Sequence, residues 1–423
     1  MKKSLFALAA LGAFASAAQA QSTVTLYGTF DTSINQVTDL RQSTTTNFGA
    51  ATAAVTTGSG TMFIDSAFAT SAWGMRGSED LGGGMKANFH LESDIVANTG
   101  ASHSAGLFRR AANVSISDAK LGEVFMGRRG NAYILATGGM LPVQGNTAHQ
   151  WRTVGYSSIG DQISNSITYA TPKMFGTNIV AQYALNNTVD AGDDGTAFAA
   201  HLINTSISGL TFSAAYNNQQ PRQLGTAQNG ASSGANSVNV AAVAASSSTP
   251  TVGVANSASV STEGYAVGLK YKFTPVLEAG VLYAHGRTNN GSATGANGVT
   301  ATGAAIAGTG ASVGLTGVGI GYQAQPNLLL GANYVSATSG AKMTNLQAHY
   351  MLSKRTRLYS QVTLTQKATM DGQGGGGAAR GFSPVGCNSN TTLVCSAGLP
   401  TTAGAQNVPT DAKGYGVGII HTF

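Results

Sequence analysis

The segment GYGVGIIHTF (residues 414–423) alternates apolar with small or polar residues up to an aromatic last position. Successive side chains of a β-strand point to opposite faces, so the alternate positions share one face. That face would carry Tyr415, Val417, Ile419, His421 and Phe423. A strand this apolar needs a hydrogen-bonding neighbour, and we expect it to pair with the first strand, TVTLYG (residues 23–28), and close a ring.

The composition narrows the fold class further. Charged residues make up 9% of the chain, and 56 of the 423 residues are glycine. Soluble domains usually contain about 25% charged residues and about 7% glycine. No stretch after residue 20 offers the roughly 18 apolar residues that a transmembrane helix needs. A closed barrel is the other structure that leaves no backbone group unpaired in lipid, so a transmembrane β-barrel is predicted.

The spacing of strand-like runs along the chain agrees with this prediction. Strand-like runs of about ten residues are separated alternately by tight turns and by longer polar tracts, as in barrels with short periplasmic turns and long outer loops. The segment SEDLGGG (residues 78–84) is expected to form a tight turn that connects the run 66–77 to the run 85–96. Polar tracts such as 38–60 and 218–261 are expected to be outer loops. We predict an all-β, antiparallel barrel of about 16 strands, with a soluble β-sandwich or solenoid as the alternative.

The first residues resemble a targeting segment. Lys2 and Lys3 precede an apolar run and the small-x-small sequence Ala18–Ala20, the order found in secretory signal peptides. A buried helix is the alternative. We therefore expect residues 1–20 to be a signal peptide and residues 21–423 to form one transmembrane β-barrel domain.

Other chemistry is weakly indicated. Cys387 and Cys395 are the two cysteines, and in an exported protein they are expected to form one disulfide, with two free thiols as the alternative. The seven histidines show no HExxH or paired metal-ligand spacing, so neither an enzyme nor a metal or other cofactor is expected. The formal net charge of +6 is not concentrated in a large basic cluster, so nucleic acid is not an expected partner.

Several stretches resemble the general-diffusion porins of the Gram-negative outer membrane, particularly an anion-preferring proteobacterial branch. The most specific is RGSEDLGGGMKANFHLE (residues 76–92). The other stretches are TLYGTFD, FRRAANVSI, LGEVFMGR, NSITYATPKMFG, YMLSKRTRLY and the closing HTF. The resemblance implies a homotrimer with one pore per subunit, lying in outer-membrane lipid and lipopolysaccharide, with Phe423 read by the assembly machinery.

The resemblance also implies that the loop after the fifth strand folds into the lumen and constricts it. Here this is the segment 131–150, which contains no Asp or Glu. Its candidate constriction residues are Asn131, Tyr133, Gly139, Pro142 and Gln150. Cation-preferring relatives place carboxylates in this loop, so its composition favours anions.

Arginines are the candidate lumen cations. In GLFRRAANVSIS (residues 106–117), alternation puts Arg109 on the polar face and Arg110 on the apolar face. Arg128 and Arg129 end the fifth strand and are further candidates, and alternation with Phe125 and Gly127 allows Arg129 to reach the lumen. Charged rings set the ion preference of a pore, and arginines favour anions. Each arginine could instead be a rim residue or the partner of an inward acid such as Asp31.

The resemblance bears on two further wall positions. Related pores carry a constriction arginine at the position of Arg109 and a wall arginine at that of Arg152. Ala72 stands where anion-preferring relatives carry another arginine, so this chain departs from their pattern.

The function expected is passive diffusion of small hydrophilic solutes and ions, with a weak preference for anions. A substrate-specific channel is the first alternative, and would need a continuous track of aromatics and arginines, to which Tyr27, Tyr133 and Tyr156 could contribute. A structural or adhesive barrel, in which the long loops matter more than the pore, is the second.

Overall fold

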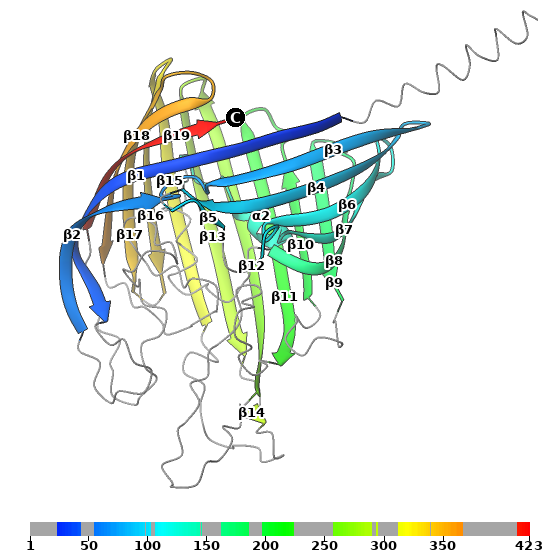
Figure 1. Ribbon diagram of the computed structural model, residues 1–423, viewed down its shortest axis with the longest axis horizontal. Coiled ribbons are helices and arrows are strands. Elements are labelled where there is room, and N and C mark those ends of the chain that lie inside the picture. The colour runs from blue at the N-terminus through cyan, green and yellow to red at the C-terminus, as the bar shows by residue number, and fades with distance from the viewer. Residues whose placement is uncertain are drawn as a thin grey trace, which may run out of the picture.

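The computed structural model (Figure 1) shows an antiparallel sheet that closes on itself into a barrel. It describes residues 23–43, 55–97, 99–102, 106–143, 145, 162–185, 197–223, 257–289, 293–294, 312–338, 340–366 and 413–423. Residues 1–20, Arg152, Tyr156 and both cysteines, for which predictions were made, lie outside these ranges. No helix among the described residues is long and apolar enough to cross a membrane.

The described residues form 19 strands in one sheet, each paired antiparallel with its neighbours. In chain order the strands are β1 (Thr23–Ser43), β2 (Val55–Asp65), β3 (Ala72–Gly82), β4 (Met85–Val96), β5 (Ala101–Ser102), β6 (Ala111–Asp118), β7 (Gly122–Gly130), β8 (Gln162–Ala170), β9 (Thr177–Ala184), β10 (Ala197–Asn204), β11 (Leu210–Gln223), β12 (Ser257–Thr274), β13 (Leu277–Asn289), β14 (Ala293–Thr294), β15 (Ser312–Gln325), β16 (Leu328–Ala337), β17 (Lys342–Met351), β18 (Thr356–Gln366) and β19 (Lys413–Thr422).

Within these ranges the ring itself has 16 members, as predicted. β2 and β3 occupy one place in it, because β1 pairs with β2 through residues 32–43 and with β3 through residues 23–29. β5 and β14 contain two residues each. β5 pairs with the end of β4 and β14 with the start of β12, so neither is counted as a separate member of the ring. The barrel therefore has an even number of strands, as bacterial single-chain barrels do.

The ring closes between the first and last strands. β19 pairs with β1 from Thr29↔Thr422 to Thr38↔Lys413. Beyond this register, Phe423 N–H donates to the Gly28 carbonyl at 3.0 Å, and Gly28 N–H donates back to the Phe423 carbonyl at 3.2 Å. The Phe423 ring covers Gly28 so closely that a Cβ there would collide with it. The predicted pairing of the closing segment is confirmed.

Side chains alternate between an exposed outer surface and a buried inner one. On β19, Tyr415, Val417, Ile419 and His421 are exposed, whereas Ile420 is buried. Tyr415 and Phe423 are eight residues apart on the outer face, about 27 Å along an antiparallel strand at 3.4 Å per residue. At the tilt of about 35–45° that such strands have, this length rises about 19–22 Å, most of an apolar band that is about 25 Å tall between two aromatic girdles.

Some boundaries differ from the sequence prediction. β1 and β2 extend to Ser43 and from Val55, into the tract 38–60 that was expected to be a loop, because their backbones pair with each other. β6 begins only at Ala111 rather than near residue 106. The turn between β3 and β4 is as tight as predicted, since Gly82, Gly83 and Gly84 all adopt positive φ, which a side chain disfavours. The short turns gather at the end of the barrel that carries the C-terminus (Figure 1).

Gly28→Val is expected to weaken the seam, because the new side chain must displace the Phe423 ring. Overpacking of this kind costs about 1–3 kcal/mol. The measurement is the temperature at which the folded barrel loses its fast migration in SDS gels. Gly60→Val is the matched control, since a Cβ at Gly60 meets nothing within 4 Å. Equal midpoints for the two variants would show that the Phe423 contact adds no stability.

Candidate functional site

Residues 131–143 and 145, called the inner loop below, follow β7 and lie inside the barrel. The loop opens with α2 (Ala132–Thr137), a helix of less than two turns. Asn131 caps the helix, because its side-chain oxygen accepts a hydrogen bond from Tyr133 N at 3.0 Å. The predicted inward fold of the segment after the fifth barrel strand is therefore observed.

Polar contacts fix the start of the inner loop to three strands. Asn131 Nδ2 donates to Asn217 Oδ1 of β11 at 3.1 Å. Ala132 N donates to Gln182 Oε1 of β9 at 3.1 Å, and His201 Nδ1 of β10 donates to the Ala132 carbonyl at 2.7 Å. All these groups are buried, and a buried polar group left without a partner is costly, so the bonds hold the helix in one position.

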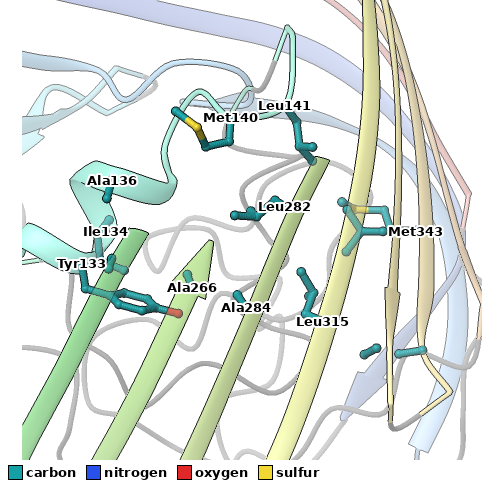
Figure 2. Close-up of a cluster of buried hydrophobic side chains, with 14 residues drawn as sticks. Tyr133, Ile134, Ala136, Met140, Leu141, Ala266, Leu282, Ala284, Leu315 and Met343 are labelled. Atoms are coloured by element: carbon teal, nitrogen blue, oxygen red, sulfur yellow. The ribbon is translucent and has the colours of Figure 1, made fainter. Parts of the chain in front are cut away.

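Apolar packing continues the attachment along the wall (Figure 2). Tyr133, Ile134, Met140 and Leu141 of the loop belong to one buried cluster with inward residues of the barrel. The labelled barrel members of this cluster are Ala266, Leu282, Ala284, Leu315 and Met343. The loop thus lies against β12 to β17 rather than across the middle of the lumen.

Glycines on the inner wall make room for the loop backbone. A Cβ at Gly280 would collide with the Met140 carbonyl, one at Gly317 would lie 2.9 Å from Leu141 Cδ1, and one at Gly331 would meet Val143. None of these three glycines has a positive φ, so the close approach of the loop, not backbone conformation, requires them.

The far end of the inner loop rests on a second inward segment, residues 66–71, which separates β2 from β3. Gly145 packs against the Phe68 ring, leaving no room for a Cβ. The Phe68 ring also meets His349 edge-on at 4.4 Å between ring centroids, and Arg357 Cζ lies 4.7 Å from its centroid. Phe68 therefore links the loop to β17 and β18.

Asp31 holds this second segment in place. Its Oδ2 accepts hydrogen bonds from the backbone N–H groups of Phe68 and Ala69, both at 2.6 Å. Its Oδ1 accepts a bond from Tyr359 OH at 2.7 Å. Asp31 is completely buried, its oxygens are occupied by backbone and tyrosine donors, and its charge also acts on Arg357 of β18.

The candidate loop residues fall into different positions. Asn131, Tyr133 and Pro142 are buried between loop and wall, and Gly139 is half-buried with a φ of +80°. Leu135, which was not singled out, is the exposed side chain of α2. Gln150 lies outside the described residues.

Charged side chains gather on another part of the wall, formed by β1, β3, β4 and the residues just before β6. Arg109 donates through Nε to Asp94 Oδ2 at 2.7 Å and also through Nη2 to the same oxygen. The predicted inward direction of Arg109 is thus found, and the side chain lies in an ion pair with an acid of β4.

Arg110 also points inward, contrary to the alternation that put it on the apolar face. Its Nε donates to Glu92 Oε1, and its Nη1 donates to Asp94 Oδ1 at 3.2 Å. Glu92 is paired with Ala111, yet its carbonyl accepts a bond from Arg110 N. Arg110 lies just before β6, so the alternation of that strand does not extend to it.

Tyr27 of β1 completes the network. Its hydroxyl donates to Glu92 Oε2 at 2.6 Å and also contacts His90 Nε2. Arg76 Cζ of β3 lies 5.3 Å from the Tyr27 ring centroid, close enough for a cation–π contact. The "charged cluster" below means Tyr27, Arg76, His90, Glu92, Asp94, Arg109 and Arg110.

Arg128 and Arg129 flank this cluster near the start of the inner loop. Arg128 donates through Nε to the Arg109 carbonyl and through Nη1 to Ser164 Oγ. Arg129 Cζ lies 3.8 Å from the Phe125 ring centroid. Ala72, where related pores carry an arginine, is buried on the inner side of β3.

His90, Glu92, Asp94 and Phe68 were not predicted from the sequence. His90, Glu92 and Asp94 occupy alternate positions of the run 85–96, which places all three on one face of a strand, and this signal could have indicated them. Phe68 and Arg357 carried no such signal, because they meet only through pairing of strands distant in the chain.

Comparisons with known proteins bear on this arrangement. The profile of the Gram-negative porin family matches residues 7–368. Outer membrane porin protein 32 of Delftia acidovorans is 36% identical over 196 residues, which cover 44% of this chain and 50% of that protein. An outer membrane porin protein of Bordetella pertussis is 31% identical over 201 residues, covering 44% and 49%. The chain thus spans about half the length of the curated relatives it matches.

Two solved structures share the fold over nearly the whole chain. The anion-selective porin from Comamonas acidovorans has a TM-score of 0.61 and 20% identity, over 95% of this chain and 100% of that one. OmpT, an outer membrane protein of Vibrio cholerae, has a TM-score of 0.54 and 11% identity, over 95% and 98%. At these identities the likeness concerns the fold alone.

Gly317→Leu is expected to push the inner loop from the wall, because the new side chain must occupy the place of Leu141. The loop carries Tyr133, Leu135 and Leu141, so its release should make the folded barrel more sensitive to chymotrypsin, which cuts after such residues. Digestion followed by mass spectrometry measures this. Gly60→Leu serves as the control, and equal cleavage in both variants would contradict the proposed packing.

Proposed function

This chain belongs to the family of Gram-negative porins, and from that membership we propose that it forms a water-filled channel for passive diffusion of small hydrophilic solutes and ions, with a weak preference for anions. It is an outer-membrane protein, and porins are channels rather than enzymes. Residues 1–20 are proposed to be a signal peptide that is removed on export, and residues 21–423 the barrel domain.

One observation supports an aqueous lumen most directly. The side chains of His90 and Arg110 point into the barrel, yet 39% and 25% of their surfaces are accessible. Charged and polar groups keep such accessibility inside a barrel only where water reaches them, because an unsolvated charge is costly. The inner loop lies against β12 to β17 and leaves the charged cluster facing this space, so loop and cluster are proposed to form the two sides of the constriction.

The charge of the constriction supports the anion preference. Arg109, Arg110 and Arg129 lie on the inner wall beside Asp94, Glu92 and Phe125, and the described part of the inner loop carries no carboxylate. Inward cations lower the energy of a permeating anion and raise that of a cation. Glu92 and Asp94 oppose this field, and Ala72 adds nothing to it, so the preference is weak.

A substrate-specific channel is less well supported. It would need aromatic side chains in series along the lumen, but Tyr133 is buried between the inner loop and the wall. Tyr27 is engaged with Glu92, and Tyr156 lies outside the described residues. The structural or adhesive alternative concerns loop tracts that also lie outside them.

A homotrimer is proposed from the outer surface. Among the described residues, the exposed outward tyrosines all lie between β8 and β19. They are Tyr169, Tyr183, Tyr265, Tyr271, Tyr283, Tyr322, Tyr334, Tyr350 and Tyr415. The outer faces of β6 and β7 instead carry Val114, Ile116, Val124 and Met126. Tyrosines prefer the membrane interfaces, so the tyrosine-bearing arc fits lipid and lipopolysaccharide, and the aliphatic arc fits a second copy of the chain.

A planar-bilayer recording under a KCl gradient tests the channel. Stepwise current, in three linked sublevels for a trimer, is expected, with a reversal potential on the chloride side. Arg109→Ala should move that potential toward zero, because one inward cation is lost. Arg287→Ala, at an exposed arginine of β13, is the control and should change nothing. No conductance from folded protein would refute the channel, and a cation-side potential would refute the role of the arginines.

Val114→Trp is expected to prevent trimer formation, because a larger side chain on the aliphatic arc disturbs a packed interface. Val267→Trp places the same change on the exposed face of β12, where lipid can rearrange around it. Light scattering of the detergent-purified barrels measures the oligomer. If both variants stay trimeric, β6 is not in the interface.

A further inference from the structure

We propose that Glu92 and Asp94 determine how strongly the channel selects anions, because they hold Arg109 and Arg110 in a charge-neutral block on the lumen wall. This inference rests on the proposed channel function. It assigns a specificity role to two acids that lie outside the inner loop, on the wall that carries the arginines themselves.

Every oxygen of the two carboxylates has a donor. Asp94 Oδ2 accepts from Nε and Nη2 of Arg109, and Asp94 Oδ1 accepts from Arg110 Nη1 at 3.2 Å. Glu92 Oε1 accepts from Arg110 Nε, and Glu92 Oε2 accepts from Tyr27 OH at 2.6 Å. Arg110 therefore bridges the two acids, and Asp94 bridges the two arginines.

The charges of this block cancel, since arginine stays protonated and two guanidinium groups face two carboxylates. The field of a compact neutral block falls off with distance faster than the field of a single charge. The carboxylates lie in direct contact with the Arg109 and Arg110 guanidinium groups, so an ion passing these arginines also passes their bound acids. Two arginines on the wall therefore add little net attraction for an anion.

The remaining anion preference must then come from inward arginines outside the block. Arg76 lies over the Tyr27 ring, and Arg129 lies over the Phe125 ring and within electrostatic reach of Glu123. His90 contacts Glu92 at 3.6 Å and adds positive charge only when protonated. Glu123, on the same wall, binds Ser115 and Asn88 rather than an arginine of the block.

Asp94→Asn removes one negative charge from the block and keeps the side-chain shape. The chloride-to-potassium permeability ratio, measured from reversal potentials in a KCl gradient, should rise about two- to fourfold, the effect of one unit charge several ångströms from an ion in water. Glu92→Gln should act in the same direction. Glu79→Gln is the matched control, because Glu79 is an exposed acid near the short turn of β3.

A double variant separates charge from structure. Arg109→Ala alone should lower the permeability ratio, and Arg109→Ala combined with Asp94→Asn should restore it to near the wild-type value. Asp94→Glu keeps the charge and should leave the ratio unchanged. The shift caused by Asp94→Asn should shrink in 1 M salt, where the Debye length falls to about 3 Å.

The outcomes distinguish this inference from the channel proposal. A wild-type barrel without conductance refutes the channel. A conducting wild type whose ratio is the same in Asp94→Asn, Glu92→Gln and Glu79→Gln refutes only the role of the two acids. If Asp94→Asn does not fold, as judged by its migration in unheated SDS gels, Glu92→Gln decides the question, since Glu92 lies at the other end of the block.

Discussion

The requirement that every backbone polar group in lipid be hydrogen-bonded governs this structure. The sheet meets it by closing, and the closing step is the pairing of β1 with β19, extended by the two bonds between Gly28 and Phe423. The even number of ring members follows, because both ends of the barrel domain must reach the same rim to pair antiparallel. The low charge content follows as well, since the outer face of each strand meets lipid rather than water.

A closed ring of this size leaves an interior that side chains alone do not fill, and the inner loop occupies part of it. The loop is held by three kinds of contact: buried hydrogen bonds to β9, β10 and β11, an apolar cluster, and glycines that admit its backbone. The backbone N–H groups of Phe68 and Ala69 bind Asp31, which fixes Phe68 in place, and the Phe68 ring supports the far end of the inner loop. The loop is thereby kept to one side, and the charged cluster faces the remaining lumen.

The charged cluster shows why counting arginines is a poor guide to ion preference. Arg109 and Arg110 are adjacent in the chain and both point inward, but each is bound to acids of β4. A guanidinium in an ion pair and one against an aromatic ring carry the same formal charge and exert different fields on a passing ion. The proposed weak anion preference depends on this difference.

The sequence by itself determined the barrel, its ring of about 16 strands and the pairing of its closing strand, because alternation, turn residues and low charge are local properties. The inward loop was expected only from the resemblance to porins. The sequence also indicated that Arg109 points inward. It placed Arg110 wrongly, since this residue lies just before β6 and donates its N–H to the Glu92 carbonyl, so the alternation of the strand does not extend to it. Only the tertiary structure decided which acid meets which arginine, that Phe68 meets Gly145, and that Asp31 is already occupied, because these partners are distant in the chain and are brought together only by strand register.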